Sequence, residues 1–215
     1  MESFEELIKI DKNRPDNQIY VYDNIISDQN CDTIVKYIND QKLVDEKENW
    51  LETNVKAKMV SHEHKLSSNL IDFVRNTISE ISNDIMLKYG IVIHGYEHFT
   101  LRKIYGPTAY HEDGPFGVDY KPGGSRVLAI IMALNGDYDG GELVFPCQNF
   151  TIKLKKGQCI LFPPYWTHPH YTNDLKNGTY RYTIITWLTR IYYSDYSKKI
   201  PQYINANIET DSECA

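Results

Sequence analysis

Short strand-like segments separated by turns fill the second half of this chain, and this pattern restricts the fold more than any other feature. Runs of β-branched and aromatic residues alternate with turns rich in glycine, aspartate or asparagine, such as 136-GDYDGGE-142 and 155-KKGQ-158. Many short strands of this kind are typical of an antiparallel β-sandwich or jelly roll. The predicted strands are 91–95, 97–105, 126–135, 142–146, 150–154, 158–162 and 180–188.

The part of the chain before Gly90 has the pattern of one strand and two helices. Residues 19–26 are predicted to form a strand, and Ser27 can cap the helix that follows it. A second helix is predicted from about 67 to 88, and the charged stretch 42–66 between the helices is expected to be loop or a short helix. Residues three or four positions apart form the two apolar faces: Cys31, Ile34, Val35 and Ile38, then Leu70, Val74, Ile78, Ile81 and Ile85.

Helices followed by many strands predict an α+β fold, in which N-terminal helices buttress a core of antiparallel strands. Neither a repeat nor a linker divides the sequence, so we expect a single domain over residues 1–215. Its helical and strand N-terminal part would run from about 19 to 90 and its strand-rich core from about 91 to 190, before a polar C-terminal tail.

The charge balance argues against one class of partner. The 23 basic and 29 acidic residues leave a formal net charge of −6, whereas a protein that binds nucleic acid needs a basic surface. The first residues, MESFEELIKIDKN, lack the basic and then apolar parts of a secretion signal, and no apolar run is long enough to span a membrane. We therefore expect a cytoplasmic protein with four reduced cysteines that binds neither nucleic acid nor membrane.

A histidine and a carboxylate stand two residues apart in 108-TAYHEDGPFG-117. On a strand, His111 and Asp113 would point to the same side of the sheet, which suits two ligands of one metal ion and equally an ordinary polar pair. His168 or His170 could complete a set of two histidines and one carboxylate. Such a set binds Fe(II) in non-haem oxygenases, because three protein ligands leave positions open for a cosubstrate and O₂.

The last predicted strand carries an arginine and a hydroxyl group on one face. Arg181 and Thr183 lie two residues apart in 178-GTYRYTIITWL-188, so their side chains point the same way. A guanidinium beside a hydroxyl suits a carboxylate, and an arginine inside an apolar barrel needs an anion. A dicarboxylic keto acid would supply that anion, whereas an exposed arginine on an edge strand would need none.

Four segments of the chain resemble one known family. They are 19-IYVYDNIISDQNCDTIVKYI-38, 133-ALNGDYDGGELVF-145, 162-FPPYWTHPH-170 and 181-RYTIITW-187. Together they resemble the Fe(II)/2-oxoglutarate-dependent dioxygenases, in the branch that is similar to prolyl 4-hydroxylases. The resemblance covers most of the chain, from about residue 19 to residue 188.

The resemblance implies a double-stranded β-helix, or jelly-roll, core and a defined metal site. It identifies His111, Asp113 and His170 as the metal ligands and catalytic residues. His170 is preferred over His168 because its proline neighbour and its distance along the chain from Arg181 fit the family pattern better.

The resemblance also implies the cosubstrates. Fe(II), 2-oxoglutarate and O₂ are expected, with ascorbate as an optional reductant. Arg181 and Thr183 would hold the far carboxylate of 2-oxoglutarate, and Tyr105 or Tyr110 would reach the same cosubstrate.

The predicted activity is hydroxylation of an unactivated C–H bond, and the resemblance favours a prolyl residue in a peptide or protein. Two alternatives stay open: a hydroxylase of a small molecule or free amino acid on the same core, and a non-catalytic β-module that binds a metal or ligand. The segment 114-GPFGVDYKPGGS-125 is expected to be a loop over the mouth of the site. Arg102 and Arg126 would bind substrate or cosubstrate, or else form salt bridges.

Overall fold

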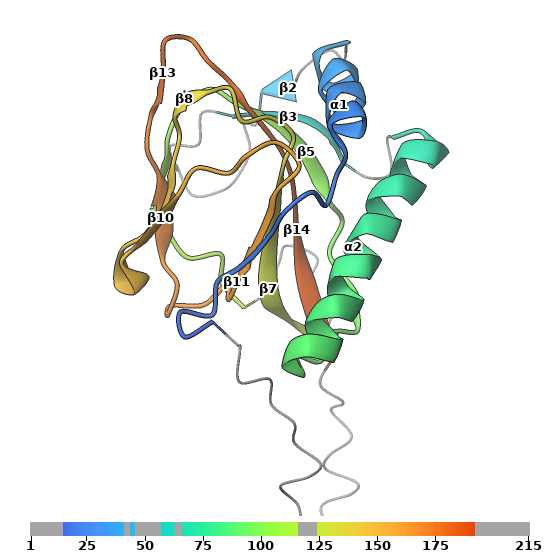
Figure 1. Ribbon diagram of the computed structural model, residues 1–215, viewed down its shortest axis with the longest axis vertical. Helices are drawn as coiled ribbons and strands as arrows, with labels where there is room; N and C mark the ends of the chain where they lie inside the picture. The colour runs from blue at the N-terminus through green and yellow to red at the C-terminus, as the bar shows by residue number, and fades with distance from the viewer. Residues whose placement is uncertain (1–14, 41–43, 46–56, 63–65, 116–123, 192–215) are drawn as a thin grey trace, which may run out of the picture.

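The computed structural model describes residues 15–40, 44–45, 57–62, 66–115 and 124–191. Two helices lie along one side of a large antiparallel sheet, and a smaller sheet lies on its other side (Figure 1). This arrangement confirms the predicted α+β fold, with a jelly-roll core of antiparallel strands that N-terminal helices buttress.

Both predicted helices are present with most of their predicted apolar faces buried, while Val35 and Leu70 are only partly buried. Helix α1 spans Asp28–Asp40, and Oγ of Ser27 caps it by accepting a hydrogen bond from the main-chain N–H of Asn30 at 3.3 Å. Helix α2 spans Ser68–Tyr89 and ends at Gly90, which adopts the left-handed conformation with φ 66°. Their buried apolar residues are Cys31, Ile34 and Ile38 in α1, and Val74, Ile78, Ile81 and Ile85 in α2.

The larger sheet has eight strands and carries the helices on one face. Its order is β1-β11-β7-β14-β5-β3-β2, with β4 paired to β14. One hydrophobic core lies between this sheet and the helices and includes Ile34, Ile78 and Leu101. The strands are β1 (Tyr20–Tyr22), β2 (Val44–Asp45), β3 (Ala57–His62), β4 (Gly95–Tyr96), β5 (Thr100–Ile104), β7 (Gly124–Ala133), β11 (Cys159–Phe162) and β14 (Arg181–Ile191).

Strands β2 and β3 correct one expectation. They lie within residues 42–66, where the sequence favoured loop or a short helix, yet β3 pairs with β5 along its length and β2 pairs with β3. The charged segment has little hydrophobic alternation of its own, so its strand conformation depends on pairing with a neighbouring strand. Such pairing is not visible in a local sequence pattern.

The smaller sheet has four strands, in the order β10-β9-β12-β6, and faces the side of the large sheet away from the helices. A second hydrophobic core joins the two sheets, with Leu143 and Phe145 on one side and Ala129 and Ile160 on the other. The remaining elements are β6 (Thr108–His111), β9 (Leu143–Phe145), η2 (Pro146–Gln148), β10 (Phe150–Ile152) and β12 (His170–Thr172), and a separate pair of β8 (Asp139–Gly140) with β13 (Leu175–Lys176).

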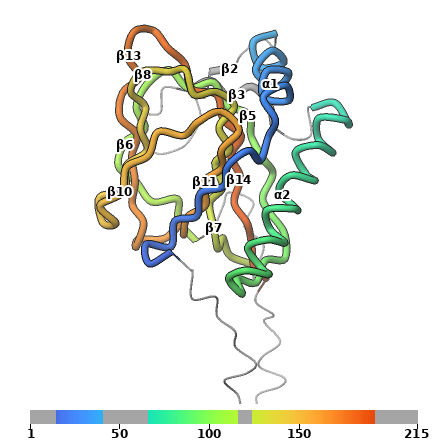
Figure 2. The backbone as a smooth tube through the Cα atoms, viewed as in Figure 1, coloured from blue at the N-terminus to red at the C-terminus, as the bar shows by residue number. Residues whose placement is uncertain are grey.

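The N-terminal strand β1 forms one edge of the larger sheet by pairing with β11. The first described segment runs across the sheet as the blue tube in Figure 2, and β1 pairs with β11 through Tyr20 opposite Leu161. The helices and the larger sheet thus share one hydrophobic core. The single domain over 1–215 stays a prediction, since both ends lie outside the described residues.

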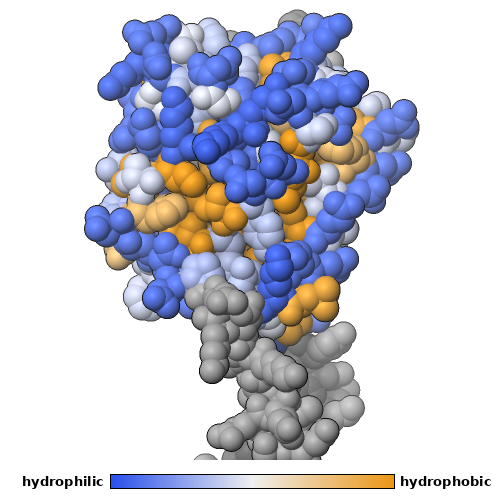
Figure 3. Space-filling model, viewed as in Figure 1, coloured by the Kyte–Doolittle hydropathy of each residue, from blue (hydrophilic) through white to orange (hydrophobic). Residues whose placement is uncertain are grey.

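The outer surface is mainly hydrophilic on the face drawn in Figure 3, with hydrophobic residues showing in separate groups. Exposed large side chains include Leu87, Trp166 and Tyr110. Within the described part of the chain, neither helix combines the length and the apolar character that crossing a membrane requires.

Candidate metal and carboxylate site

The pairing of β6 with β12 brings two histidines together. His111 ends β6 and His170 begins β12, and the two residues lie directly opposite each other in the ladder. Opposite residues of an antiparallel pair project to the same face, and the two imidazole rings are 4.4 Å apart between centroids. Asp113 follows two residues later, with its Oδ1 3.6 Å from Nε2 of His111. One ligand atom from each of the three side chains lies within 4.8 Å of the others.

Main-chain carbonyl groups orient both imidazoles. Nδ1 of His111 lies 2.8 Å from the carbonyl oxygen of Ala109, and Nδ1 of His170 lies 3.1 Å from that of His168. Nδ1 of each ring therefore faces a main-chain acceptor, and Nε2 is the nitrogen left for a metal ion, which binds it unprotonated. Burial lowers the pKa of His111, but the hydrogen bond and the charge of Asp113 outweigh burial and leave the pKa raised, so a metal ion would displace a proton from this imidazole.

The charges in this cluster favour a cation. Burial raises the pKa of the Asp113 carboxyl, but hydrogen bonding and charge from His111, together with His170, outweigh burial and leave the pKa lowered. Burial also lowers the pKa of His170, so this imidazole stays neutral. Among the described residues, the buried Oδ2 of Asp113 has no hydrogen-bond partner. An ionised carboxylate with a bare buried oxygen beside a neutral imidazole therefore suits a divalent metal ion.

His168 has a different role from His170. Its Nε2 lies 2.8 Å from the carbonyl oxygen of Asn17, and its Nδ1 lies 2.9 Å from Oγ1 of Thr167. Both ring nitrogens thus have protein partners, and the ring fixes the N-terminal segment against the loop before β12. The structure groups His170, and not His168, with His111 and Asp113.

A second polar feature is an arginine buried inside the barrel. Arg181 and Thr183 line a small cavity of about 10 Å³ that is otherwise largely apolar, and both residues are buried. Nη1 of Arg181 donates to the carbonyl oxygen of Gly141 at 2.9 Å, whereas its buried Nε has no partner among the described residues. Burial lowers the pKa of this guanidinium, since no described carboxylate compensates its charge. The apolar residues around it are Ile131, Ala133, Leu143, Ile152 and Leu154.

The tyrosine that borders this cavity is Tyr138, which the sequence did not single out. Its hydroxyl donates to the carbonyl oxygen of Leu154 at 3.1 Å, and the residue is 1% exposed. Tyr105 and Tyr110 are 40% and 61% exposed and do not line the cavity. Tyr110 precedes His111 on β6, so strand alternation directs it away from the face that carries the histidine. Tyr138 lies in the turn 136–142, where no local pattern indicates which way a side chain points.

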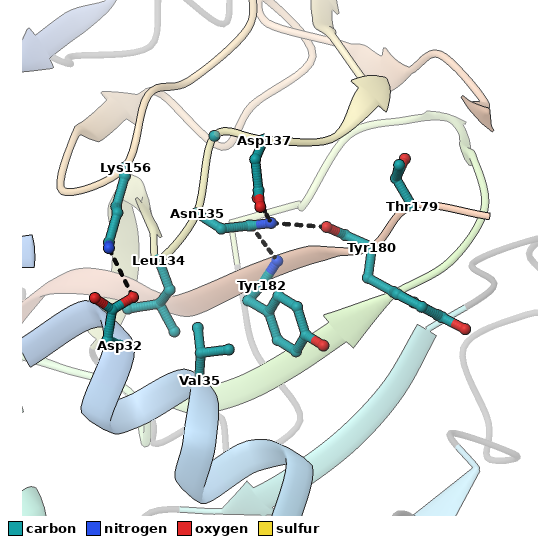
Figure 4. Close-up of a pocket in the computed structure, with 10 residues that line it drawn as sticks. Asp32, Val35, Leu134, Asn135, Asp137, Lys156, Thr179, Tyr180 and Tyr182 are labelled. Atoms are coloured by element: carbon teal, nitrogen blue, oxygen red, sulfur yellow. Dashed lines mark hydrogen bonds and ion pairs between the residues drawn. The ribbon is translucent and has the colours of Figure 1, made fainter. Parts of the chain in front are cut away.

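Asn135 fixes the strand that carries Arg181. Its Nδ2 donates to the carbonyl oxygen of Tyr180 at 2.8 Å, and its Oδ1 accepts from the main-chain N–H of Tyr182 at 2.9 Å (Figure 4). One amide therefore holds the backbone on both sides of Arg181. The pocket in Figure 4, of about 640 Å³, lies between α1 and the outer face of β14 and shares no residue with the Arg181 cavity.

Comparison with known proteins agrees with this arrangement. Residues 102–189 match the family model described as the 2OG-Fe(II) oxygenase superfamily, and no curated protein sequence matches the chain. A viral collagen prolyl hydroxylase from Paramecium Bursaria Chlorella virus-1, solved as its 2OG complex, is similar with a TM-score of 0.59 and 19% identity over 80% of this chain and 96% of that one.

Two further solved structures are similar in the same way. A Trichoplax adhaerens prolyl hydroxylase, in complex with a peptide fragment of the hypoxia inducible factor oxygen degradation domain, gives a TM-score of 0.62 and 16% identity over 80% of this chain and 84% of that one. A Pseudomonas putida prolyl-4-hydroxylase gives 0.59 and 15% over 80% and 92%. At these identities the likeness shows a common fold.

Proposed function

We propose that this chain, a member of the 2OG-Fe(II) oxygenase superfamily, hydroxylates prolyl residues of a peptide or protein. The observation that carries the proposal is the cluster of His111, Asp113 and His170, whose ligand atoms lie within 4.8 Å of one another. The same barrel buries Arg181, a cation with an unused donor among the described residues. The site therefore suits a metal cation at one end and an organic anion at the other.

The metal end would hold Fe(II) through Nε2 of both histidines and a carboxylate oxygen of Asp113. Two neutral imidazoles and one carboxylate are the ligand set of non-haem Fe(II) oxygenases. Phe145 and Phe162 pack against the ring of His170, with centroids 5.4 and 4.7 Å from it. These aromatic rings restrict the imidazole plane and would keep water from that side of a bound metal ion.

The carboxylate end would hold 2-oxoglutarate. Nε of Arg181 and the hydroxyl of Thr183 face the same cavity, and together they suit the far carboxylate of a dicarboxylic keto acid. The apolar lining of this cavity strengthens the charge pairing by excluding water. Asn135 holds the backbone of β14 in place and so fixes the direction of the guanidinium.

The overall reaction balances without another reactant. Fe(II) held by His111, Asp113 and His170 would serve to activate O₂, with 2-oxoglutarate giving up two electrons and leaving as succinate and CO₂. One oxygen atom enters succinate, and the other converts the substrate C–H bond to C–OH. The protein contributes the ligand set, the anchored cosubstrate and a water-poor cavity.

A prolyl substrate is supported by the three similar structures, all described as prolyl hydroxylases, one of them with a bound peptide fragment. The loop expected over the mouth, 114–125, lies outside the described residues from 116 to 123.

The experiment that tests this function is a substrate search with purified protein, Fe(II), 2-oxoglutarate and O₂. A set of proline-containing peptides is incubated with the protein, and peptide mass and succinate are both measured. The proposal predicts a gain of one oxygen atom in a peptide, matched by an equal amount of succinate. Tandem mass spectrometry then places the oxygen on a proline.

Two other results would contradict the prolyl assignment in different ways. Oxygen gain on a free amino acid or another small molecule, with none on peptides, would support the alternative hydroxylase. No turnover of any substrate and no uncoupled succinate would favour a non-catalytic binding module. The Asp113→Ala variant serves as the blank for the assay.

A further inference from the structure

Asp113 is held differently from the two histidines. His111 and His170 lie in the β6–β12 ladder, where strand pairing fixes their positions. Strand β6 ends at His111, so Asp113 lies on an irregular segment, and Gly114 after it turns in the left-handed region with φ 77°. The main chain around Asp113 therefore needs another support if its carboxylate is to face the two imidazoles.

Arg126 on β7 provides that support. Its Nη1 donates to the carbonyl oxygen of Asp113 at 2.8 Å, and its main-chain N–H donates to the carbonyl oxygen of Pro115 at 2.8 Å. Side chain and backbone of one residue thus bracket Gly114. Gly114 itself donates to the carbonyl oxygen of Pro164 at 2.8 Å, which ties the segment to the loop before β12.

The guanidinium of Arg126 is itself immobilised. Its Nε and Nη2 donate to the two carboxylate oxygens of Glu97 at 2.6 and 2.7 Å, and Arg126 is 1% exposed. The main-chain oxygen of Glu97 accepts from Oγ1 of Thr186 at 2.5 Å. A bidentate pair of this kind fixes the plane of the guanidinium, which a lysine ammonium cannot reproduce.

Trp187 completes the support. The guanidinium of Arg126 lies 3.8 Å from the centre of the indole ring, a stacked cation–π arrangement. The buried indole nitrogen of Trp187 has no hydrogen-bond partner among the described residues, so the contact of this side chain with Arg126 is through the face of its ring. Arg126 thus holds the main chain of Asp113 while its own guanidinium is stacked on an indole ring.

Each guanidinium nitrogen of Arg126 has a protein partner. Nε and Nη2 donate to Glu97 and Nη1 donates to the carbonyl oxygen of Asp113, and the ion pair with Glu97 adds no net charge beside the metal end. Arg181 differs, since its Nε has no partner among the described residues. Because its guanidinium is already paired with Glu97, Arg126 is a poorer receptor for an anionic cosubstrate than Arg181 is. Cosubstrate binding was one of the roles that the sequence allowed for Arg126.

We propose that Arg126 is the positioning residue for the Asp113 ligand: fixed by Glu97 and stacked on Trp187, it sets the main chain at Asp113 so that the carboxylate completes the metal site. The inference rests on the proposed metal-binding function of this site. It assigns to Arg126 and Glu97 a part in metal affinity although neither touches the metal, since partners of a ligand typically change affinity about 10–100-fold.

The test measures Co(II) binding to metal-free protein by its visible absorption, which reports both affinity and coordination geometry without turnover. We expect Arg126→Lys to weaken Co(II) binding by about 10-fold or more and to change the band shape. Glu97→Gln should weaken binding less, because the amide keeps one acceptor for the guanidinium. Arg190→Gln, a change of an arginine near the end of β14, should leave Co(II) affinity and spectrum unchanged.

The outcomes separate this inference from the proposed function. Wild-type protein that binds no Co(II) would overturn both. Wild-type binding together with a folded Arg126→Lys variant of unchanged affinity and spectrum would overturn the inference alone. If Arg126→Lys does not fold, Arg126→Met with Glu97→Met decides, because replacing both members of a buried pair is often tolerated. That double variant should show the same loss of affinity, and wild-type affinity in it would contradict the inference.

Discussion

The two ends of the proposed site are built from different parts of the jelly roll. At the metal end, His111 and His170 come from the smaller sheet, while the residues that support Asp113 belong to the larger sheet. At the carboxylate end, Arg181 is the first residue of the central strand β14. Asn135 hydrogen-bonds the main chain on either side of it, at Tyr180 and Tyr182. The histidine ligands of the metal end therefore come from the smaller sheet and Asp113 is supported from the larger one, whereas the arginine of the carboxylate end comes from the larger sheet and its cavity is lined also by Leu143 and Ile152 of the smaller one.

This difference predicts two separable sets of variants. Changes at the metal end should alter metal affinity and, through it, every later step. Changes at the carboxylate end should alter 2-oxoglutarate affinity and leave metal affinity as it is. Distances along the chain do not show this division, because Arg181 is only eleven residues after His170.

The largest effect is expected for the metal ligands. His170→Ala should weaken Co(II) or Fe(II) binding by more than about 100-fold, since loss of a ligand should exceed the effect of its outer partners. His168→Ala is the matched control, because His168 lies two residues away and has protein partners on both nitrogens. Metal titration monitored by absorption measures both. If His168→Ala lost the metal and His170→Ala kept it, the ligand set would be wrong.

The next effect is expected at the carboxylate end. Arg181→Gln should weaken 2-oxoglutarate binding by about 10–100-fold, because a hydrogen bond to a charged group contributes about 1.5–3 kcal/mol. Metal affinity should not change. Arg190→Gln, near the other end of β14, is the control on the same strand. Calorimetric titration with 2-oxoglutarate in the presence of Zn(II) checks this, and equal losses of metal and keto-acid affinity would remove the distinction between the ends.

A smaller effect is expected when the clamp on β14 is removed. Asn135→Ala loses the hydrogen bonds to Tyr180 and Tyr182, each of about 1 kcal/mol, and should weaken 2-oxoglutarate binding by about 5–10-fold. Asp137→Ala is the control, since it removes only the contact between Asp137 and Nδ2 of Asn135 (Figure 4). An Asn135→Ala variant with unchanged keto-acid affinity and only lower thermal stability would assign Asn135 a purely structural role.

The smallest effect concerns the tyrosine beside Arg181. Tyr138→Phe removes the hydroxyl that donates to Leu154 and should weaken 2-oxoglutarate binding by about 2–5-fold, in line with one neutral hydrogen bond. Tyr105→Phe and Tyr110→Phe should have no effect, because neither residue lines the cavity. Competition titration with labelled 2-oxoglutarate resolves differences of this size, and a larger loss for Tyr110→Phe would restore the expectation from sequence.

The helices and central strands were predictable because their patterns are local. Cys31, Ile34 and Ile38 follow helical spacing, and all three are buried on α1. Strands β7 and β14 begin and end within about three residues of their predicted limits, since long β-branched runs leave few alternatives. Strand β3 was missed because pairing with β5, and not its own composition, makes it a strand.

The sequence predicted that His111 and Asp113 lie close together, but the structure gives a different reason for it. His111 and Asp113 do meet, but not as neighbours on a strand, because β6 ends at His111. Asp113 reaches the site through the turn at Gly114 and the contact with Arg126. The pair of Arg126 with Glu97 joins residues 29 positions apart, and the partner of His168 lies 151 positions away. No local pattern contains such contacts.

The most direct test of the central claim is an anaerobic titration of metal-free protein with Fe(II) and 2-oxoglutarate, followed by visible absorption. The wild-type protein should develop the weak charge-transfer band of an iron-chelated keto acid. The band should be absent in His170→Ala and should need far more 2-oxoglutarate in Arg181→Gln. A wild-type protein that binds Fe(II) tightly but gives no band with 2-oxoglutarate would contradict the two-ended site.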